Sequence, residues 1–324
     1  MDRPRRHGPS IGATIAAMGT RVAVVDIGTN STRLLVADVE HGAVAELERE
    51  SIVTRLGAGL ERTGELGEEA QARVMAALER YATAIERCGA VVRVAVLTSA
   101  VRDARNGARF AAAVRDRFGL DGRTLSGDQE ARLTYRGAAA GWAAGGPLLV
   151  VDIGGGSTEL IVGEDGAVAF HVSTQVGVVR HTERHLHGDP PAPGEIEALA
   201  RDARPVFEAA VPERVRAGVR AAVAVAGTAT SCAAIDLELE PYDPARVEGH
   251  ALSRACLEAI GGRLAALPLG ERRAVPGLHP DRAPTIVAGV TVLLEVLALF
   301  GLDGVEVSEH DILWGVALEE ADNV

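Results

Sequence analysis

The sequence contains no lysine, so all 33 of its basic side chains are arginines. Together with 45 acidic residues they give a formal net charge of −12, which argues against general binding to nucleic acid or to an anionic membrane. A polyanion site would therefore have to be built locally from clustered arginines, whose planar guanidinium group pairs with phosphate through two hydrogen bonds.

Cysteine is also scarce. Cys88, Cys232 and Cys256 are odd in number, widely spaced and outside any Cys-x-x-Cys motif, which argues against a disulfide framework and a structural zinc site. We therefore expect a reducing, cytoplasmic location. Long apolar runs are missing too: the best candidate, residues 291–300, is too short to cross a membrane and contains Glu295, so we expect no membrane partner.

Aromatic residues make up only 3% of the chain, whereas apolar residues make up 47%, a composition that fits an α/β protein built from alanine, valine and leucine. A length of 324 residues is enough for two domains with a core each. We expect residues 1–20 to be a disordered N-terminal extension, with Met18 as an alternative start. A Gly/Ala-rich break at 141–147 separates the two predicted domains, 21–140 and 141–324.

Apolar periodicity predicts strands and helices in alternation. After a first hairpin within 24–36, strands are expected at 43–56, 91–97, 123–125, 147–152, 157–162, 166–173, 221–226 and 304–307. Helices are expected at 68–87, 106–118, 129–140, 177–186, 194–210, 252–267, 283–300 and 310–319.

A repeated glycine turn is the most informative feature present. Residues 24–36 read Val-Val-Asp-Ile-Gly-Thr-Asn-Ser-Thr-Arg-Leu-Leu-Val, and residues 150–162 read Val-Val-Asp-Ile-Gly-Gly-Gly-Ser-Thr-Glu-Leu-Ile-Val. The two stretches align without a gap, and their polar residues repeat as well as their apolar ones. This favours a duplicated domain over two unrelated hairpins, with the two turns facing each other across a cleft.

Each turn offers backbone amides and hydroxyls to an anion, with a carboxylate beside it. This combination suits a phosphate whose charge is partly balanced by a divalent cation, although a tight hairpin alone would also use the glycines. We expect Asp152 and Glu159 to hold Mg²⁺ directly or through water, with Asp26 in the matching role of the first half. The predicted phosphate-binding residues are Gly28, Thr29, Asn30, Ser31, Gly154, Gly155, Gly156, Ser157 and Thr158.

Two further segments follow predicted strands. Residues 98–102 lie at the carboxyl end of a β-branched strand, where ligands of open α/β sheets gather, and we expect Arg102 to bind the reacting phosphate. The alternative is a solvated surface arginine. In the second segment Ser126 or Asp128 caps a helix whose first turn carries Glu130, which could orient a water molecule or merely interact favourably with the helix dipole.

These motifs resemble the exopolyphosphatase/guanosine pentaphosphate phosphatase family of the actin/hexokinase-like superfamily. The similarity runs from residue 21 to the C-terminus, and 307–313 is most similar to the actinobacterial branch. It implies two duplicated actin-like (ribonuclease H-like) domains with mixed sheets flanked by helices, and a homodimer. Independently of the resemblance, the expected C-terminal helix could pack back on the first domain, which the sequence does not decide. The resemblance also makes Glu130 the base; the family often has Glu just before that residue, where this chain has Gln129.

We therefore expect a Mg²⁺-dependent phosphohydrolase. It would release terminal orthophosphate from inorganic polyphosphate, or the 5′ γ-phosphate of guanosine pentaphosphate, by in-line attack of water oriented by Glu130. One alternative is a catalytically weak regulator that binds polyphosphate or guanosine tetra- or pentaphosphate, to which Gln129 is a hint. Another is a small-molecule kinase of the same superfamily, with 227–230 as an adenosine-binding turn.

Two other groups of residues have simpler interpretations. His181, His185 and His187 lie on a short polar helix without an acidic partner at zinc-site spacing, so we expect a solvated helix. Four arginines are spaced as they would be along helices: Arg180, Arg184, Arg201 and Arg204. They could form a track for a long polyanion, but ordinary exposed helix faces explain the spacing equally well.

Overall fold

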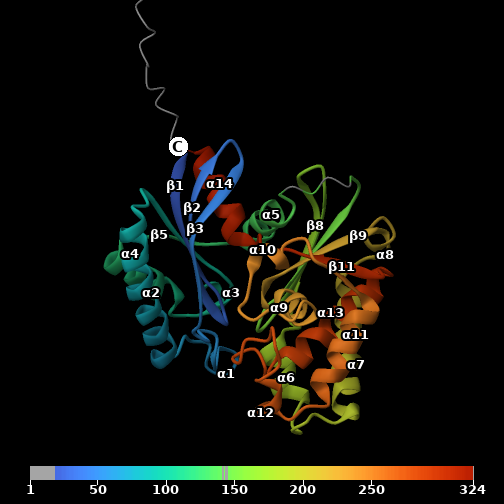
Figure 1. The fold of residues 1–324 in the computed structure, drawn as a ribbon. Helices are drawn as coiled ribbons and strands as arrows, with labels where there is room; N and C mark the ends of the chain where they lie inside the picture. The colour runs from blue at the N-terminus through green and yellow to red at the C-terminus, as the bar shows by residue number, and fades with distance from the viewer. Residues whose placement is uncertain (1–18, 141, 143–144, 324) are drawn as a thin grey trace, which may run out of the picture.

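The computed structural model describes residues 19–140, 142 and 145–323, with the side chain of Glu61 excepted. The expected N-terminal extension lies almost entirely outside the described residues, as does part of the break at 141–147. The described chain forms two lobes, each built on one sheet, which lie side by side with helix α5 (Gly127–Ala138) between them (Figure 1).

The first sheet has five strands in the order β3-β2-β1-β4-β5. Their bounds are β1 (Thr20–Ile27), β2 (Ser31–Glu40), β3 (Ala43–Val53), β4 (Val92–Leu97) and β5 (Asp121–Thr124). β1 pairs antiparallel with β2 and parallel with β4. Because side chains alternate along a strand, Val25 of β1 faces one apolar cluster and Val24 faces another, so both faces of this sheet are covered.

The second sheet repeats this arrangement. Its order is β10-β11-β9-β6-β7-β8, in which β6 pairs antiparallel with β7 and parallel with β9, as β1 does with β2 and β4. The bounds are β6 (Leu148–Ile153), β7 (Thr158–Glu164), β8 (Ala167–Thr174), β9 (Ala221–Val225), β10 (Ala251–Ser253) and β11 (Gly304–Val307). The predicted duplicated α/β fold with two mixed sheets is confirmed.

Helices cover both sheets. The first half of the chain carries α1 (Leu60–Thr63), α2 (Glu68–Cys88), α3 (Ser99–Asp103), α4 (Gly107–Phe118) and α5. The second half carries α6 (Val178–His185), α7 (Pro193–Ala210), α8 (Glu213–Arg216), α9 (Ala226–Asp236), α10 (Pro244–Val247), α11 (Arg254–Ala265), α12 (Leu269–Arg272), α13 (Ile286–Phe300) and α14 (Ile312–Asp322). None of the described helices is both long enough and apolar enough to cross a membrane.

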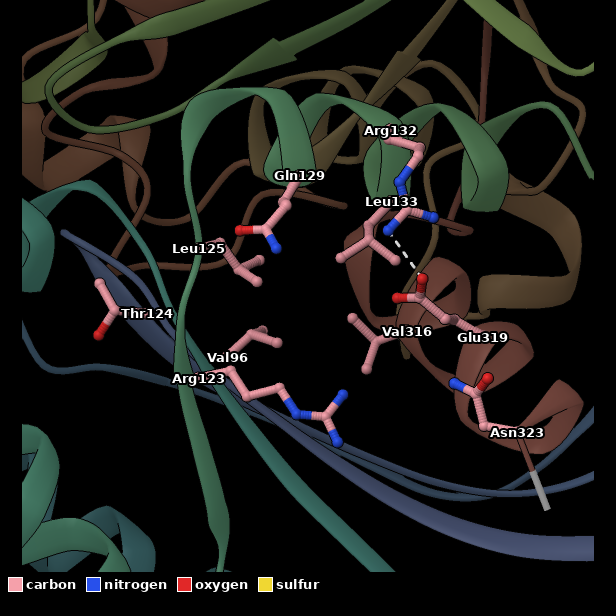
Figure 2. Close-up of a pocket in the computed structure, with 10 residues that line it drawn as sticks. All are labelled: Val96, Arg123, Thr124, Leu125, Gln129, Arg132, Leu133, Val316, Glu319 and Asn323. Carbon is pink, nitrogen blue, oxygen red and sulfur yellow. Dashed lines mark hydrogen bonds and ion pairs between the residues drawn. The ribbon is translucent and has the colours of Figure 1, made fainter.

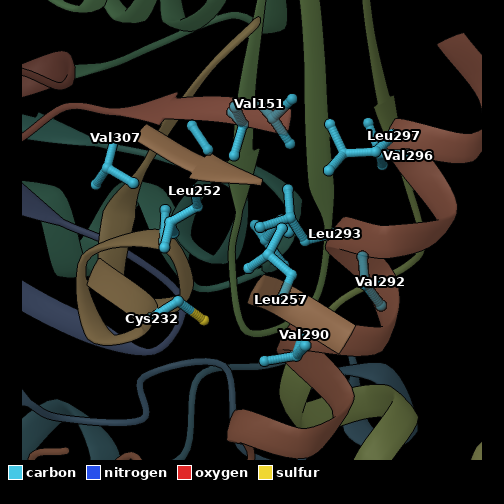
Figure 3. Packing of buried hydrophobic residues seen from close by; sticks show 14 of the residues in the cluster. Val151, Cys232, Leu252, Leu257, Val290, Val292, Leu293, Val296, Leu297 and Val307 are labelled. Atoms are coloured by element: carbon cyan, nitrogen blue, oxygen red, sulfur yellow. The ribbon is translucent and has the colours of Figure 1, made fainter. Parts of the chain in front are cut away.

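The main core of the second half lies between its sheet and helices α7, α9, α11 and α13. Figure 3 shows Leu293 and Leu297 of α13 directed toward Val151 of β6, with Leu257 of α11 beside them. The sequence interpretation placed the start of α11 two residues early, because residues 251–253 pair with β11 as a short strand. Ser253 then caps the helix, its Oγ accepting a hydrogen bond from the Cys256 amide at 3.1 Å.

The two halves exchange a helix. α14 packs on the first sheet, where Leu313 and Val316 join the cluster of Val24, whereas α5 sends Tyr135 into a cluster with Val150 on the second sheet. In Figure 1 the red α14 accordingly lies against the blue strands β1 and β2. The predicted domain boundary near residue 140 stays a prediction, because α5, which ends just before it, packs on the second sheet, and α14 of the second half packs on the first.

Two glycines let α5 and α14 touch. A Cβ built on Gly315 would lie 1.8 Å from the Leu133 carbonyl oxygen, and one on Gly137 would lie 2.0 Å from the Asp311 carbonyl oxygen. No larger residue fits either position without separating the helices. This close approach brings the start of α14 beside the helix that carries Glu130.

Candidate active site

The two repeated hairpins place their charged residues opposite each other. Asp26 of β1 is the register partner of Arg33 on β2, and Asp152 of β6 is the register partner of Glu159 on β7. Each hairpin is closed by the same hydrogen bond, from the Gly28 amide to Ser31 O at 3.0 Å and from the Gly154 amide to Ser157 O at 2.9 Å. The amides of Gly28 and Gly154 are therefore occupied inside their turns, which corrects the expectation that they face a phosphate.

The remaining amides of the second turn are aimed by helix α6. The amides of Val178 and Val179 donate to the carbonyls of Gly154 and Gly155, and Arg180 Nε donates to Gly156 O. In a trans peptide the N–H points opposite to the C=O. The amides that follow these carbonyls, those of Gly155, Gly156 and Ser157, therefore point away from α6, as an anion-binding turn requires.

The first turn is held in the same way by a loop. Its Asn30 carbonyl accepts from the Thr54 and Arg55 amides, at 3.0 and 2.8 Å, and its Thr29 carbonyl accepts from the Gly57 amide at 2.9 Å. The amides of Asn30 and Ser31 consequently point away from this loop.

The two turns face each other, as the sequence repeat predicts, but they lie in direct contact instead of on opposite sides of a cleft. A Cβ on Gly155 would come within 3.0 Å of the Asn30 Cβ, and one on Gly156 within 3.8 Å of Thr29 Cγ2. Thr158 does not share this position. It is fully buried and its hydroxyl donates to Val176 O at 2.6 Å, so the expectation that its side chain contacts phosphate is corrected.

An ion-pair chain occupies the first half of the site. Arg33 donates from Nε and Nη2 to Asp26 Oδ2, at 2.9 and 2.6 Å, and from Nη1 to Asp311 Oδ2. Burial lowers the pKa of Arg33, but the carboxylates around it raise that pKa above its ordinary value. The other oxygen of Asp26, Oδ1, is buried without a hydrogen-bond partner among the described residues, an arrangement that calls for a cation or a bound water.

The second half of the site has no arginine at the equivalent position. Burial, together with nearby carboxylates, raises the pKa of Asp152 to about 7 and that of Glu159 to about 8. Glu159 Oε1 accepts hydrogen bonds from Ser157 Oγ and Ser173 Oγ, both at 2.7 Å. Two adjacent acids that resist ionisation, with the unsatisfied Asp26 oxygen nearby, fit the oxygen donor set of a divalent cation.

Glu130 and Arg102 are in direct contact. Ser126 caps α5, so the helix begins at Gly127 rather than near Gln129, and Glu130 lies in its first turn. Arg102 Nη1 donates to Glu130 Oε2 at 3.0 Å and to Leu125 O at 2.9 Å. Burial raises the pKa of Glu130 despite Arg102, and the charge of Asp26 contributes, which places Glu130 near the first hairpin.

Sequence reasoning missed three charged residues of the site: Arg33, Asp311 and Arg282. The guanidinium of Arg282 covers Gly227, where a Cβ would lie 2.3 Å from Cζ. Burial and the charge of Arg33 lower the pKa of Arg282, so the charged guanidinium is disfavoured at this position. The contact with Arg282 explains why residue 227 is a glycine, and no adenosine ligand is needed to explain it.

Helix α6, which carries His181 and His185, lies next to a carboxylate. Asp202 of α7 lies beside α6, and its Oδ2 is 2.9 Å from His185 Nε2 and 3.7 Å from His181 Nε2. His181 is buried, so the expectation of a solvated helix without a carboxylate was wrong. Arg184 already pairs with this carboxylate oxygen at 2.9 Å, and the Gly177 amide donates to His181 Nδ1 at 3.4 Å, so these groups satisfy one another without a metal ion.

The arginine track is not supported. Arg184, Arg201 and Arg204 each pair with a carboxylate of α7 or α13. Arg180 instead bonds the glycine turn and Gln175. Three of the four charges are thus neutralised within the protein.

A cavity of about 210 Å³ lies elsewhere, between β4, β5, α5 and α14 (Figure 2). Gln129 lines it, and the Arg132–Glu319 pair closes one side at 2.7 Å. Gln129 also completes the cap of α5, with its Oε1 accepting from the Ser126 amide at 2.9 Å. Its side chain is therefore engaged in helix capping and not in the carboxylate cluster.

Known proteins match this chain over nearly its whole length. The model of the Ppx/GppA phosphatase family matches residues 35–323. Exopolyphosphatase 2 of Mycobacterium tuberculosis is 39% identical over 316 residues, which cover 93% of this chain and 99% of that protein. The crystal structure of the Ppx/GppA family member of Aquifex aeolicus matches with a TM-score of 0.81 and 29% identity, covering 94% of this chain and 98% of that one. An exopolyphosphatase structure from Cytophaga hutchinsonii matches with a TM-score of 0.82, 25% identity and coverages of 94% and 99%.

Proposed function

Because this chain belongs to the Ppx/GppA phosphatase family, we propose that it releases terminal orthophosphate from inorganic polyphosphate. It is a hydrolase that acts on phosphoric anhydrides. Polyphosphate is our first choice of substrate because two of the proteins it resembles are named exopolyphosphatases. Guanosine pentaphosphate, whose terminal phosphoryl group has the same anhydride chemistry, is the second substrate to be tested.

The observation that carries the proposal is that the two glycine turns meet close to five carboxyl groups. These are the side chains of Asp26, Glu130, Asp152, Glu159 and Asp311. The amides of Gly155, Gly156 and Ser157 point away from α6, and Thr29 and Asn30 lie against this turn from the other half. A chain of phosphoryl groups placed there receives hydrogen bonds from both halves of the fold. Arg102 and Arg282 supply the positive charge that the terminal phosphate needs.

Glu130 is the group we propose to orient the attacking water and accept its proton. Its raised pKa makes it a stronger base than an ordinary carboxylate, and its hydrogen bond to Arg102 fixes its orientation. In-line attack would then break the terminal P–O bond, and the shortened polyphosphate would leave as the other product.

Members of this family generally depend on a divalent metal ion, and we propose Mg²⁺. Asp152, Glu159 and Asp26 would hold this ion. It would give Asp26 Oδ1 a partner and allow Asp152 and Glu159, whose pKa values are raised, to ionise. When bound, the ion would neutralise phosphate oxygens and position them for attack. The predicted homodimer stays a prediction, as does the cytoplasmic location, with which three free cysteines are compatible.

A single assay tests the proposal. Phosphate release is measured on polyphosphates of several lengths and on guanosine pentaphosphate, with Mg²⁺ and with EDTA. We expect Mg²⁺-dependent release from at least one substrate. If the wild-type protein binds polyphosphate and guanosine pentaphosphate but releases phosphate from neither, the regulator hypothesis is supported. ATP-dependent phosphorylation of a small molecule would support the kinase hypothesis.

A further inference from the structure

Asp311 joins two elements at the edge of the site. Its Oδ1 caps α14, accepting a hydrogen bond from the Leu313 amide at 2.9 Å, while its Oδ2 pairs with Arg33. The side chain is almost fully buried, with 2% of its surface exposed, and its carbonyl lies against Gly137 of α5. It is therefore fixed by backbone on both sides.

This pairing leaves Arg33 little freedom. Nε and Nη2 are committed to Asp26 and Nη1 to Asp311, so the planar guanidinium is bound along two of its edges. Capping α14 needs no charge on residue 311, because serine or asparagine serve as well. The negative charge at this position consequently has another effect, which acts on Arg33 and on the surrounding site.

The charge also reaches the second hairpin. The hairpin that carries Arg33 meets the second hairpin where Gly155 approaches Asn30, so Arg33 and Asp311 lie within electrostatic range of Asp152 and Glu159, which face each other across β6 and β7. An arginine free to turn toward Asp152 would neutralise that acid and repel a cation. An arginine held between Asp26 and Asp311 leaves the two acids of the second hairpin without a positive partner, so a divalent cation can displace their protons and bind there.

We propose that Asp311 is a positioning residue that fixes Arg33 as the counter-ion of Asp26 and thereby makes the site bind a divalent cation before it binds phosphate. The inference rests on the proposed function and specifies its order of binding. With Arg33 committed, a phosphate finds no free edge of this guanidinium, whereas a cation finds two acids without a positive partner.

The test is the charge-only change Asp311→Asn, which keeps an acceptor for the Leu313 amide. Binding is measured without turnover in two experiments. Mn²⁺, a spectroscopic probe for a divalent cation, is titrated into the substrate-free protein and free Mn²⁺ is followed by electron paramagnetic resonance. Labelled polyphosphate is titrated in EDTA and followed by fluorescence anisotropy.

We expect opposite shifts. Removing a unit charge from a partly dry site should weaken Mn²⁺ binding about tenfold, while metal-free polyphosphate binding should tighten several-fold because Arg33 gains a free edge. In an Arg33→Met background, Asp311→Asn should no longer tighten polyphosphate binding. If the variant only lost the helix cap, it would bind both Mn²⁺ and polyphosphate more weakly, or its melting temperature would fall without opposite shifts in the two affinities.

Glu319→Gln serves as the matched control, since it removes another carboxylate that joins α14 to α5, through Arg132. It should leave both affinities unchanged. If Asp311→Asn lowers the melting temperature, Asp311→Ser, which also caps, replaces it. Unchanged or parallel affinities in a folded variant would overturn the inference and leave the phosphohydrolase proposal intact. Wild-type protein that binds Mn²⁺ yet releases no phosphate would instead overturn that proposal alone.

Discussion

Arg33 and Glu159 occupy the same position in the two hairpins of the duplicated fold, directly opposite Asp26 and Asp152. In the first hairpin the partner is a cation, so the charge of Asp26 is compensated inside the protein. In the second the partner is another acid, so charge compensation has to come from outside. The proposed metal site therefore centres on the second hairpin, to which Asp26 of the first adds its unpaired Oδ1.

Glu130→Gln should lose most phosphate release. The substitution keeps the size of the side chain and its contact with Arg102 but removes the base, whose contribution is typically about 10² to 10⁴-fold in rate. Polyphosphate binding, measured by anisotropy, should change by less than about threefold, because removing one carboxylate reduces repulsion only slightly. Near-normal turnover would exclude Glu130 as the base.

Gln129→Glu should leave turnover within about twofold of wild type. The residue closes a capping box with Ser126, and glutamate performs this role as well as glutamine. Steady-state kinetics on polyphosphate check this expectation. A large gain in activity would mean that Gln129 holds back catalysis, as the regulator hypothesis requires.

Stability without divalent cations should fall as the pH rises. Asp152 and Glu159 titrate near 7 and 8 in the folded protein, but near the ordinary values of about 4 in the unfolded chain. Between these values the folded state binds more protons, so the free energy of unfolding decreases with increasing pH.

Thermal melts in EDTA from about pH 6 to about pH 9 measure this effect, and they should show a decline of several degrees. A bound divalent cation takes the place of the protons, so stabilisation by Mg²⁺ should grow over the same interval. Glu159→Gln should flatten the EDTA curve. A wild-type curve that rises with pH would contradict the assignment of these two acids.

Arg282→Gln should raise the KM for polyphosphate by roughly tenfold to a hundredfold, the cost of losing a charge-assisted hydrogen bond. Stability should hold or improve, because the variant removes a cation that burial and Arg33 both disfavour. Arg263→Gln, on α11, is a comparable change outside the site and should alter neither quantity. An unchanged KM for Arg282→Gln would remove this residue from substrate binding.

Much of the fold follows from local pattern. The apolar spacing of residues 68–87 predicted α2, which spans Glu68–Cys88, and the repeat of residues 24–36 predicted two equivalent hairpins. These elements are decided by near neighbours in sequence. Element ends were less predictable: capping by Asp311 moves the start of α14 to Ile312, two residues after the expected position.

Asp26, Asp152, Glu159 and the turn glycines could be singled out as candidates because they are part of the repeat. Arg33 belongs to the same stretch, but its role depends on Asp311, a partner 278 residues away. The same holds for Arg282, which reaches Gly227 only after folding, and for Asp202, which approaches the histidines from a different helix. No local pattern records such distant contacts.

The helix exchange between the lobes has a consequence for biosynthesis. The face of the first sheet that carries Val22 and Val24 is buried mainly by residues of α14. A ribosome therefore has to deliver almost three hundred further residues before this face can be covered. Until then the early strands expose an apolar face, and we expect chaperones to bind a nascent chain that stalls before α14.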